Sequence, residues 1–140
     1  MVDLVQWLTA QLDEDERVAL AATQHRWIVS ERKTPASADS PSGDPFWVAA
    51  DEGFGAPAFQ FKDKRDAEFI AAHDPARVLR EIDAKRKLLA RYERAMENRR
   101  AHPDDLASAG ALLALHGAVK LLAAPYADRP DYEEAVASFG

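Results

Sequence analysis

The sequence Ala-Ala-His-Asp-Pro-Ala-Arg, residues 71–77, opens the stretch that decides the fold, and this stretch continues to Arg100. Asp is a favoured N-cap residue and Pro is favoured at the first helical position, so Asp74 and Pro75 predict a helix start. Proline also disfavours the helical conformation in the residue before it, which predicts a bend away from the preceding chain. A helix over 75–100 would be about 39 Å long at roughly 1.5 Å per residue. We expect it to be the scaffold of the fold.

This helix is predicted to have one apolar side and one basic side. Measured at about 100° per residue, four large apolar side chains lie within about 40° of one line and predict a core-facing stripe. They are Ile82, Leu89, Tyr92 and Met96. Lys85 falls inside the stripe, where its ammonium must either reach water or meet a carboxylate. Four basic residues share the outward side, namely Arg80, Lys87, Arg91 and Arg94.

The basic side has two interpretations. It is an ordinary solvated helix surface, or it binds an acidic partner or nucleic acid. Glu81 and Lys85 are an attractive i,i+4 pair, whereas Lys87 and Arg91 are a repulsive one, so local pairing does not explain this side. We therefore treat it as a candidate partner-binding site.

N-terminal to this stretch, the pattern predicts a helix followed by a small sheet. Apolar spacing predicts a helix over about 3–22 that Asp3 caps. Its run of four acidic residues, 13–16, points in several directions around the helix, so we predict a solvated face. Three strands with antiparallel connections are then expected. They cover residues 27–33, 46–49 and 58–61.

The Pro/Ser/Ala/Asp-rich residues 34–45 predict a flexible loop between the first two strands. The sheet region is rich in aromatic residues, which either form its core against a helix or line a ligand pocket. They are Trp27, Phe46, Trp47, Phe54, Phe59 and Phe61. We favour the core.

C-terminal to the stretch, His102-Pro103-Asp104-Asp105 predicts a break and a second helix start. Residues 106–124 are apolar nearly all round. A membrane span is disfavoured because the segment is barely long enough and contains His116 and Lys120. We expect instead a helix antiparallel to 75–100 and buried on several sides, either in the core or half in a subunit interface. Small residues favour a homodimer packed through this helix, with Gly110, Ala114, Gly117 and Ala118 as the predicted interface. Beyond it, Tyr126 and Tyr132 are expected to turn their hydroxyls to water.

The composition fits one domain over residues 1–140 of the α+β class. The net charge of −6 argues against a general nucleic-acid binder. There is no cysteine, which excludes disulfides, thiolate nucleophiles and cysteine metal sites. The N-terminus does not have the pattern of a secretory signal, so we expect a cytoplasmic protein.

Two motifs resemble a known family. Residues 73–86 read His-Asp-Pro-Ala-Arg-Val-Leu-Arg-Glu-Ile-Asp-Ala-Lys-Arg, and residues 121–132 read Leu-Leu-Ala-Ala-Pro-Tyr-Ala-Asp-Arg-Pro-Asp-Tyr. With the acidic first helix running into Thr23 and Trp27, they are similar to a domain family of unknown function found in actinobacteria and their phages. The resemblance covers about half the chain and implies a biological setting but no activity. Members often carry cysteines between the motifs, and this chain has none, so a metal or redox role tied to them does not transfer.

The sequence offers little for catalysis. His73 with Asp74, and His102 with two aspartates, lie at opposite ends of the long helix and cannot share a site. His73 is better explained by helix initiation, and His116 by a core or interface contact. No hydrolase or metalloprotease motif is present. We expect no enzyme, metal or cofactor.

Two function hypotheses follow. The first is a small interaction or adaptor protein, in the manner of a phage accessory factor acting on a host protein. It would use the apolar helix for a homodimer or another protein partner and would need no membrane. The alternative is a nucleic-acid-associated regulator using the basic face.

Overall fold

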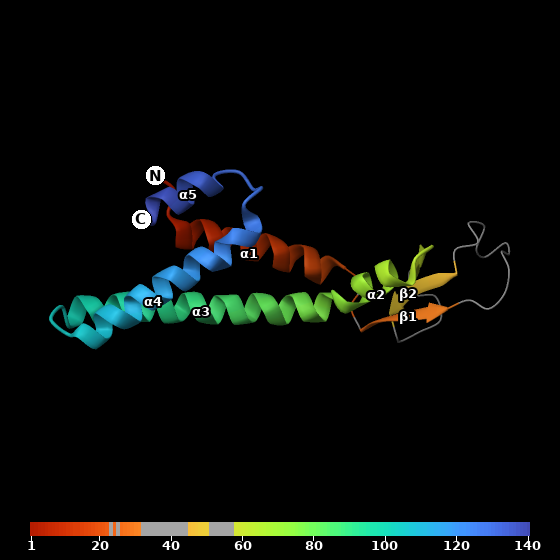
Figure 1. Cartoon of the computed structure of the whole chain (residues 1–140), viewed down its shortest axis with the longest axis horizontal. Helices are drawn as coiled ribbons and strands as arrows, with labels where there is room; N and C mark the ends of the chain where they lie inside the picture. The colour runs from red at the N-terminus through yellow and green to blue at the C-terminus, as the bar shows by residue number, and fades with distance from the viewer. Residues whose placement is uncertain (23, 25, 32–44, 51–57) are drawn as a thin grey trace. The chain divides into compact units, whose positions relative to one another are not determined.

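The structure is a computed structural model that describes residues 1–22, 24, 26–31, 45–50 and 58–140. It confirms the α+β class, with an N-terminal helix, a three-stranded antiparallel sheet and then long helices (Figure 1). The elements are α1 (Leu4–Ala21), β1 (Trp27–Glu31), β2 (Phe46–Ala50), β3 (Ala58–Phe61), α2 (Lys64–Ala72), α3 (Pro75–Ala101), α4 (Leu106–Ala123), the 3-10 helix η1 (Ala124–Tyr126) and α5 (Tyr132–Ser138).

Contacts divide the chain into two compact units. The helical unit comprises Met1–Asp15 and Glu81–Gly140, and the sheet unit comprises Glu16–Arg80. One domain over 1–140 stays a prediction. The predicted loop 34–45 lies outside the described residues except for its last residue, as does Phe54 of the predicted aromatic core.

The sheet unit is a meander in the order β1-β2-β3, and α2 contacts all three strands. The register pairs Val29 with Val48 and Val48 with Phe59. Val48 and Ala67 of α2 are fully buried, whereas Phe59 is 51% exposed. The prediction that aromatic residues form this core is therefore wrong in part. Small aliphatic side chains fill its centre because α2 presents an alanine there.

Local capping explains where the helices begin. The Asp3 carboxylate accepts a hydrogen bond from the Gln6 N–H at 2.9 Å, and the Asp74 carboxylate accepts one from the Arg77 N–H at 2.8 Å, as predicted. Asp63 caps α2 in the same way. Hydrogen bonds from the side chain and then the backbone N–H of Arg65 hold the pKa of Asp63 at about 2.

The helical unit is built from α4 and the part of α3 from Glu81 onward, which fold back on each other, with the first part of α1 and α5 beside them (Figure 1). Leu4, Leu8 and Leu12 of α1 are fully buried in it. The predicted stripe of α3 also faces this core, since Ile82, Leu89 and Tyr92 are at most 6% exposed. Beside this core, three rings pack together. His116 stacks on Phe139 with centroids 4.0 Å apart, and Tyr92 lies 5.4 Å from Phe139.

Candidate functional site

The most unusual surface of the helical unit is one side of α4. At about 100° per residue, six exposed residues fall within an arc of about 100°. We call this side the α4 face, and it consists of Leu106, Gly110, Leu113, Ala114, Gly117 and Leu121. The three leucines are 88%, 74% and 76% exposed. An unbroken apolar strip of this kind is typical of a binding surface rather than of solvated helix.

The opposite side of α4 contacts the rest of the unit through a narrow strip, in which Ser108, Val119 and Ala123 are buried. Of the two expected alternatives, burial of this helix in the core on several sides is therefore wrong, and half burial with a subunit interface stays a prediction. Because the apolar residues of α4 lie nearly all round the helix, this narrow contact leaves several of them exposed among the described residues.

The structure places three of the four predicted interface residues on the α4 face. Gly110, Ala114 and Gly117 are exposed, whereas Ala118 lies at its edge and is half-buried. A Cβ atom added at Gly110 or Gly117 would meet nothing within 4 Å. The described residues of the chain therefore leave these positions open to a closely approaching backbone.

By length and composition alone, one helical segment among the described residues would be able to cross a membrane. It is Leu106–Tyr126, and only 17% of its most apolar window is buried. The polar side chains of His116 and Lys120 interrupt it, and both contact the carbonyl oxygen of Gly140.

The sequence model of a family of unknown function, DUF6221, matches residues 1–136. The chain belongs to DUF6221. The match includes both motifs and nearly the whole chain, and is more extensive than the resemblance at the two motifs. No curated protein and no solved structure matches the chain.

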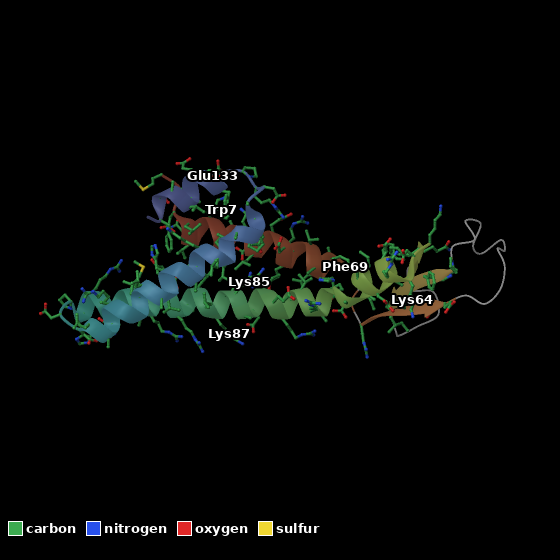
Figure 2. The ribbon with its side chains drawn as sticks, in the orientation of Figure 1. Trp7, Lys64, Phe69, Lys85, Lys87 and Glu133 are labelled. Atoms are coloured by element: carbon green, nitrogen blue, oxygen red, sulfur yellow. The ribbon has the colours of Figure 1, made fainter. Side chains whose placement is uncertain are left out.

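The basic residues predicted as a binding site in this DUF6221 chain do not form one free surface. Arg80 belongs to the sheet unit, and the other three belong to the helical unit. Lys87 lies on the side of α3 away from Lys85 (Figure 2), and its ammonium is 2.6 Å from the Asp83 carboxylate. The inference that this side lacks local pairing is thus wrong for Lys87. Arg91 and Arg94 are exposed and have no ion-pair partner in the described part of the chain.

Within the acidic run in α1 of the DUF6221 chain, the Asp15 side chain is only 28% exposed, which corrects the prediction of a solvated face at this residue, whereas Asp13 is 62% exposed and solvated as predicted. The Asp13 carboxylate is 2.7 Å from the Arg86 guanidinium. The Asp15 carboxylate accepts a hydrogen bond from the Tyr126 hydroxyl at 2.6 Å and lies 3.6 Å from the Arg129 guanidinium. The Tyr126 hydroxyl is therefore turned inward, contrary to expectation.

Lys85 joins Asp15, Tyr126 and Arg129 in one cluster. An aromatic partner explains its place in the apolar stripe. Its ammonium lies 5.4 Å from the centroid of the Tyr126 ring and 3.5 Å from the Tyr126 hydroxyl. Burial, followed by the hydrogen bond to Asp15, raises the pKa of Tyr126 well above its ordinary value. The cluster joins α1, α3 and η1, and its groups satisfy one another. We therefore assign it a structural role in the DUF6221 fold.

His73, like His116, has structural contacts. His73 ends α2, where its backbone N–H donates to the Ile70 carbonyl and its ring lies 4.3 Å from the Phe69 ring. Within the described residues, no three His, Asp or Glu side chains are grouped so that they could hold a metal ion.

Proposed function

We propose that this DUF6221 protein is an interaction protein rather than a catalyst, and that its α4 face binds the same face of a second copy. The single observation that carries the proposal is the row of three leucines, each at least 74% exposed, with two open glycines between them. Small residues allow two helix backbones to approach closely, and leucines on either side then pack against the partner helix.

The apolar surface extends beyond the α4 face. A shallow hollow of about 300 Å³ adjoins it and is lined by Arg99, Ala109, Leu112, Leu113 and His116. Leu113 belongs to both. A leucine from a partner helix would enter this hollow, which gives the contact more area than a single helix surface provides.

The charge distribution favours a second copy in the antiparallel orientation. Two chains of net charge −6 repel each other, so they are expected to meet where charge is absent. No charged residue lies between Asp105 and Lys120. In an antiparallel pair, the acidic start of each α4 would lie beside the lysine near the end of its partner, and the helix dipoles would oppose each other.

The expected affinity is modest. A fully buried leucine side chain contributes about 1.5–3 kcal/mol, so six leucines supply on the order of 10 kcal/mol. Association itself costs about 4–15 kcal/mol. At the lower end of that cost the net is about 6 kcal/mol, so we expect a dissociation constant on the order of 10–100 μM.

Sedimentation equilibrium from a few to several hundred micromolar tests the proposal. We expect a monomer–dimer equilibrium for the wild type and a monomer throughout for Leu113→Glu. Leu20→Glu is the matched control, because Leu20 is also an exposed helical leucine, at 59%, but lies on α1 in the sheet unit. A wild-type monomer at the highest concentration, or equal effects of the two substitutions, would overturn the proposal.

Two further experiments test the alternative ligands, which are a membrane and nucleic acid. Flotation with anionic vesicles would show a membrane as the ligand of the α4 face if the wild type binds and Leu113→Glu does not. Binding to duplex or single-stranded DNA at low salt that Arg91→Gln and Arg94→Gln abolish would instead favour the nucleic-acid alternative. A phage-type role on a host protein would be a more specific form of the proposed interaction function.

A further inference from the structure

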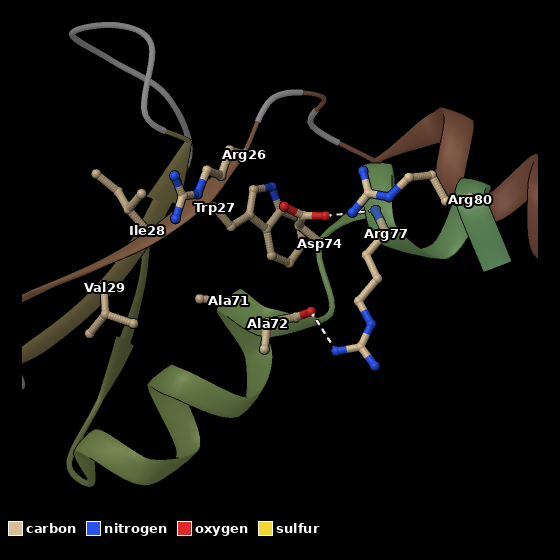
Figure 3. Close-up of a pocket in the computed structure, with 9 residues that line it drawn as sticks. All are labelled: Arg26, Trp27, Ile28, Val29, Ala71, Ala72, Asp74, Arg77 and Arg80. Carbon is tan, nitrogen blue, oxygen red and sulfur yellow. Dashed lines mark hydrogen bonds between the residues drawn. The ribbon is translucent and has the colours of Figure 1, made fainter.

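The sheet unit contains an open cleft of about 500 Å³, a volume within the usual range of small-ligand sites (Figure 3). Its walls come from three places in the sequence. They are the start of β1 with the residue before it, the end of α2, and the start of α3. All of them belong to the same compact unit, so the cleft is a property of that unit alone.

The charge of the cleft is opposite to that of the chain. Arg26, Arg77 and Arg80 line it together with one acidic residue, Asp74, which gives a local charge of 3 − 1 = +2. The whole chain carries −6. A cleft with this charge is expected to attract anions.

The three arginines have different surroundings. The Arg77 guanidinium donates to the Ala72 carbonyl at 3.1 Å, so it joins the end of α2 to the start of α3 (Figure 3). Arg26 and Arg80 are exposed, and neither has an ion-pair partner among the residues that the structure describes. Figure 3 shows their guanidinium groups on either side of Trp27 and Asp74. These two groups are therefore available to an incoming anion.

Trp27 and Asp74 offer contacts that a small inorganic anion would not use. Trp27 is half-buried in the wall of the cleft, and its ring lies 6.0 Å from the Phe59 ring. An indole in such a wall offers a flat surface to a planar ring. Asp74 uses Oδ1 to cap α3, which leaves Oδ2 as an acceptor for an N–H or O–H of a ligand.

We propose that this cleft binds a small anionic ligand that joins a phosphate to a planar ring, such as a nucleoside monophosphate. The guanidinium groups of Arg26 and Arg80 neutralise the phosphate, because arginine donates paired hydrogen bonds to phosphate oxygens. The ring lies against Trp27, and an amino or hydroxyl group donates to Asp74. This site is separate from the α4 face and does not depend on self-association.

The test is a titration of the ¹⁵N-labelled full chain with the four nucleoside monophosphates, followed by backbone and indole NMR shifts. Inorganic phosphate and an unphosphorylated nucleoside are the partial probes. We expect at least one monophosphate to bind at micromolar to millimolar concentrations and to shift the Trp27 indole signal. It should bind more tightly than either partial probe, since each supplies only half of the contacts.

Substitutions of Arg26, Arg80 and Trp27 test the individual contacts. Arg26→Gln and Arg80→Gln should each weaken binding by about tenfold, whereas Lys64→Gln, with the same change of charge at an exposed residue of the sheet unit that does not line the cleft, should leave it unchanged. Trp27→Leu should weaken the binding of the nucleotide and leave the binding of inorganic phosphate unchanged. Its backbone NMR spectrum checks that the sheet is intact. Absence of binding by every monophosphate, or binding that both arginine variants retain, would overturn the proposal. Equal affinity for phosphate and nucleotide would overturn the role of Trp27.

Discussion

The hydroxyl group of Tyr126 can be removed without removing its ring, which makes Tyr126→Phe a specific test of the helical unit. The substitution deletes the donor of the 2.6 Å hydrogen bond to Asp15 and the 3.5 Å contact with Lys85. It keeps the edge-to-face contact with Trp7, whose ring centroid is 6.4 Å away, and the contact of Lys85 with the ring face. Any change in stability therefore reports mainly on the hydrogen bond.

The expected loss can be worked from the two partners. A hydrogen bond to a charged group contributes about 1.5–3 kcal/mol to stability. The Asp15 side chain is 28% exposed and keeps Arg129 nearby, so water and the guanidinium compensate in part. We expect the free energy of unfolding to fall by about 1.5–2 kcal/mol, or roughly 4–8 °C in Tm for a chain of this size.

The pH dependence gives the prediction a second signature. The pKa of Tyr126 is raised in the folded protein, so the hydroxyl stays protonated there while the unfolded chain ionises above its ordinary pKa of about 10. The unfolded state then binds fewer protons, and wild-type stability falls with rising pH by about 1.4 kcal/mol per pH unit from this group. The difference between wild type and Tyr126→Phe should stay constant from about pH 7 to 9 and shrink above about pH 10.

Urea unfolding followed by circular dichroism and tryptophan fluorescence at several pH values measures both quantities. Asp15→Asn and the double variant complete a thermodynamic cycle that isolates the coupling between the two residues. The hydrogen bond would be refuted if Tyr126→Phe lowered the free energy of unfolding by less than about 0.5 kcal/mol and the difference between wild type and variant stayed constant above pH 10.

Three further substitutions test single contacts, each by urea unfolding at protein concentrations below the dimerisation range. Asp105→Ala should destabilise the protein by about 1 kcal/mol, because its carboxylate accepts from the Ala107 and Ser108 N–H groups at 3.1 Å, and Asp105→Asn should restore most of this. An equal loss for both would contradict a capping role. Gly117→Ala should stabilise by about 1 kcal/mol, since alanine favours the helix and its Cβ meets no neighbour, and a loss would mean that the α4 face is covered. Trp7→Phe should cost about 1–3 kcal/mol through the lost 3.0 Å bond from the indole N–H to the Pro130 carbonyl, and a neutral effect would contradict that contact.

The elements of the fold could be predicted because their signals are local. Asp74 with Pro75 marks the start of α3, and Asp105 marks the start of α4, as both side chains accept hydrogen bonds from N–H groups in the next turn. The strands follow from short runs of β-forming residues between turn signals. Exposure of the α4 face was not predictable in this way, since hydrophobicity says that a surface needs cover but not which molecule supplies it.

The partners of the charged residues were predictable only in part. Asp83 and Lys87 are an i,i+4 pair that the sequence itself displays, although Lys87 also has a repulsive i,i+4 neighbour in Arg91. Asp15 and Tyr126 are different, because 111 residues separate them and no local rule connects them. The same holds for the cleft of the sheet unit, which brings Trp27 together with the start of α3.

Disulfide trapping is the measurement that tests the α4 face most directly, because the chain contains no cysteine to interfere. Ala114 lies near the middle of the face along the helix axis, so two antiparallel copies would bring Ala114→Cys within bonding distance of its own counterpart. Leu106→Cys alone should not crosslink, because in that orientation it faces Leu121, about 22 Å along the helix. We predict a covalent dimer for Ala114→Cys and for the mixture of Leu106→Cys with Leu121→Cys. An Ala114→Cys chain that crosslinks no faster than Leu20→Cys would contradict self-association through this face.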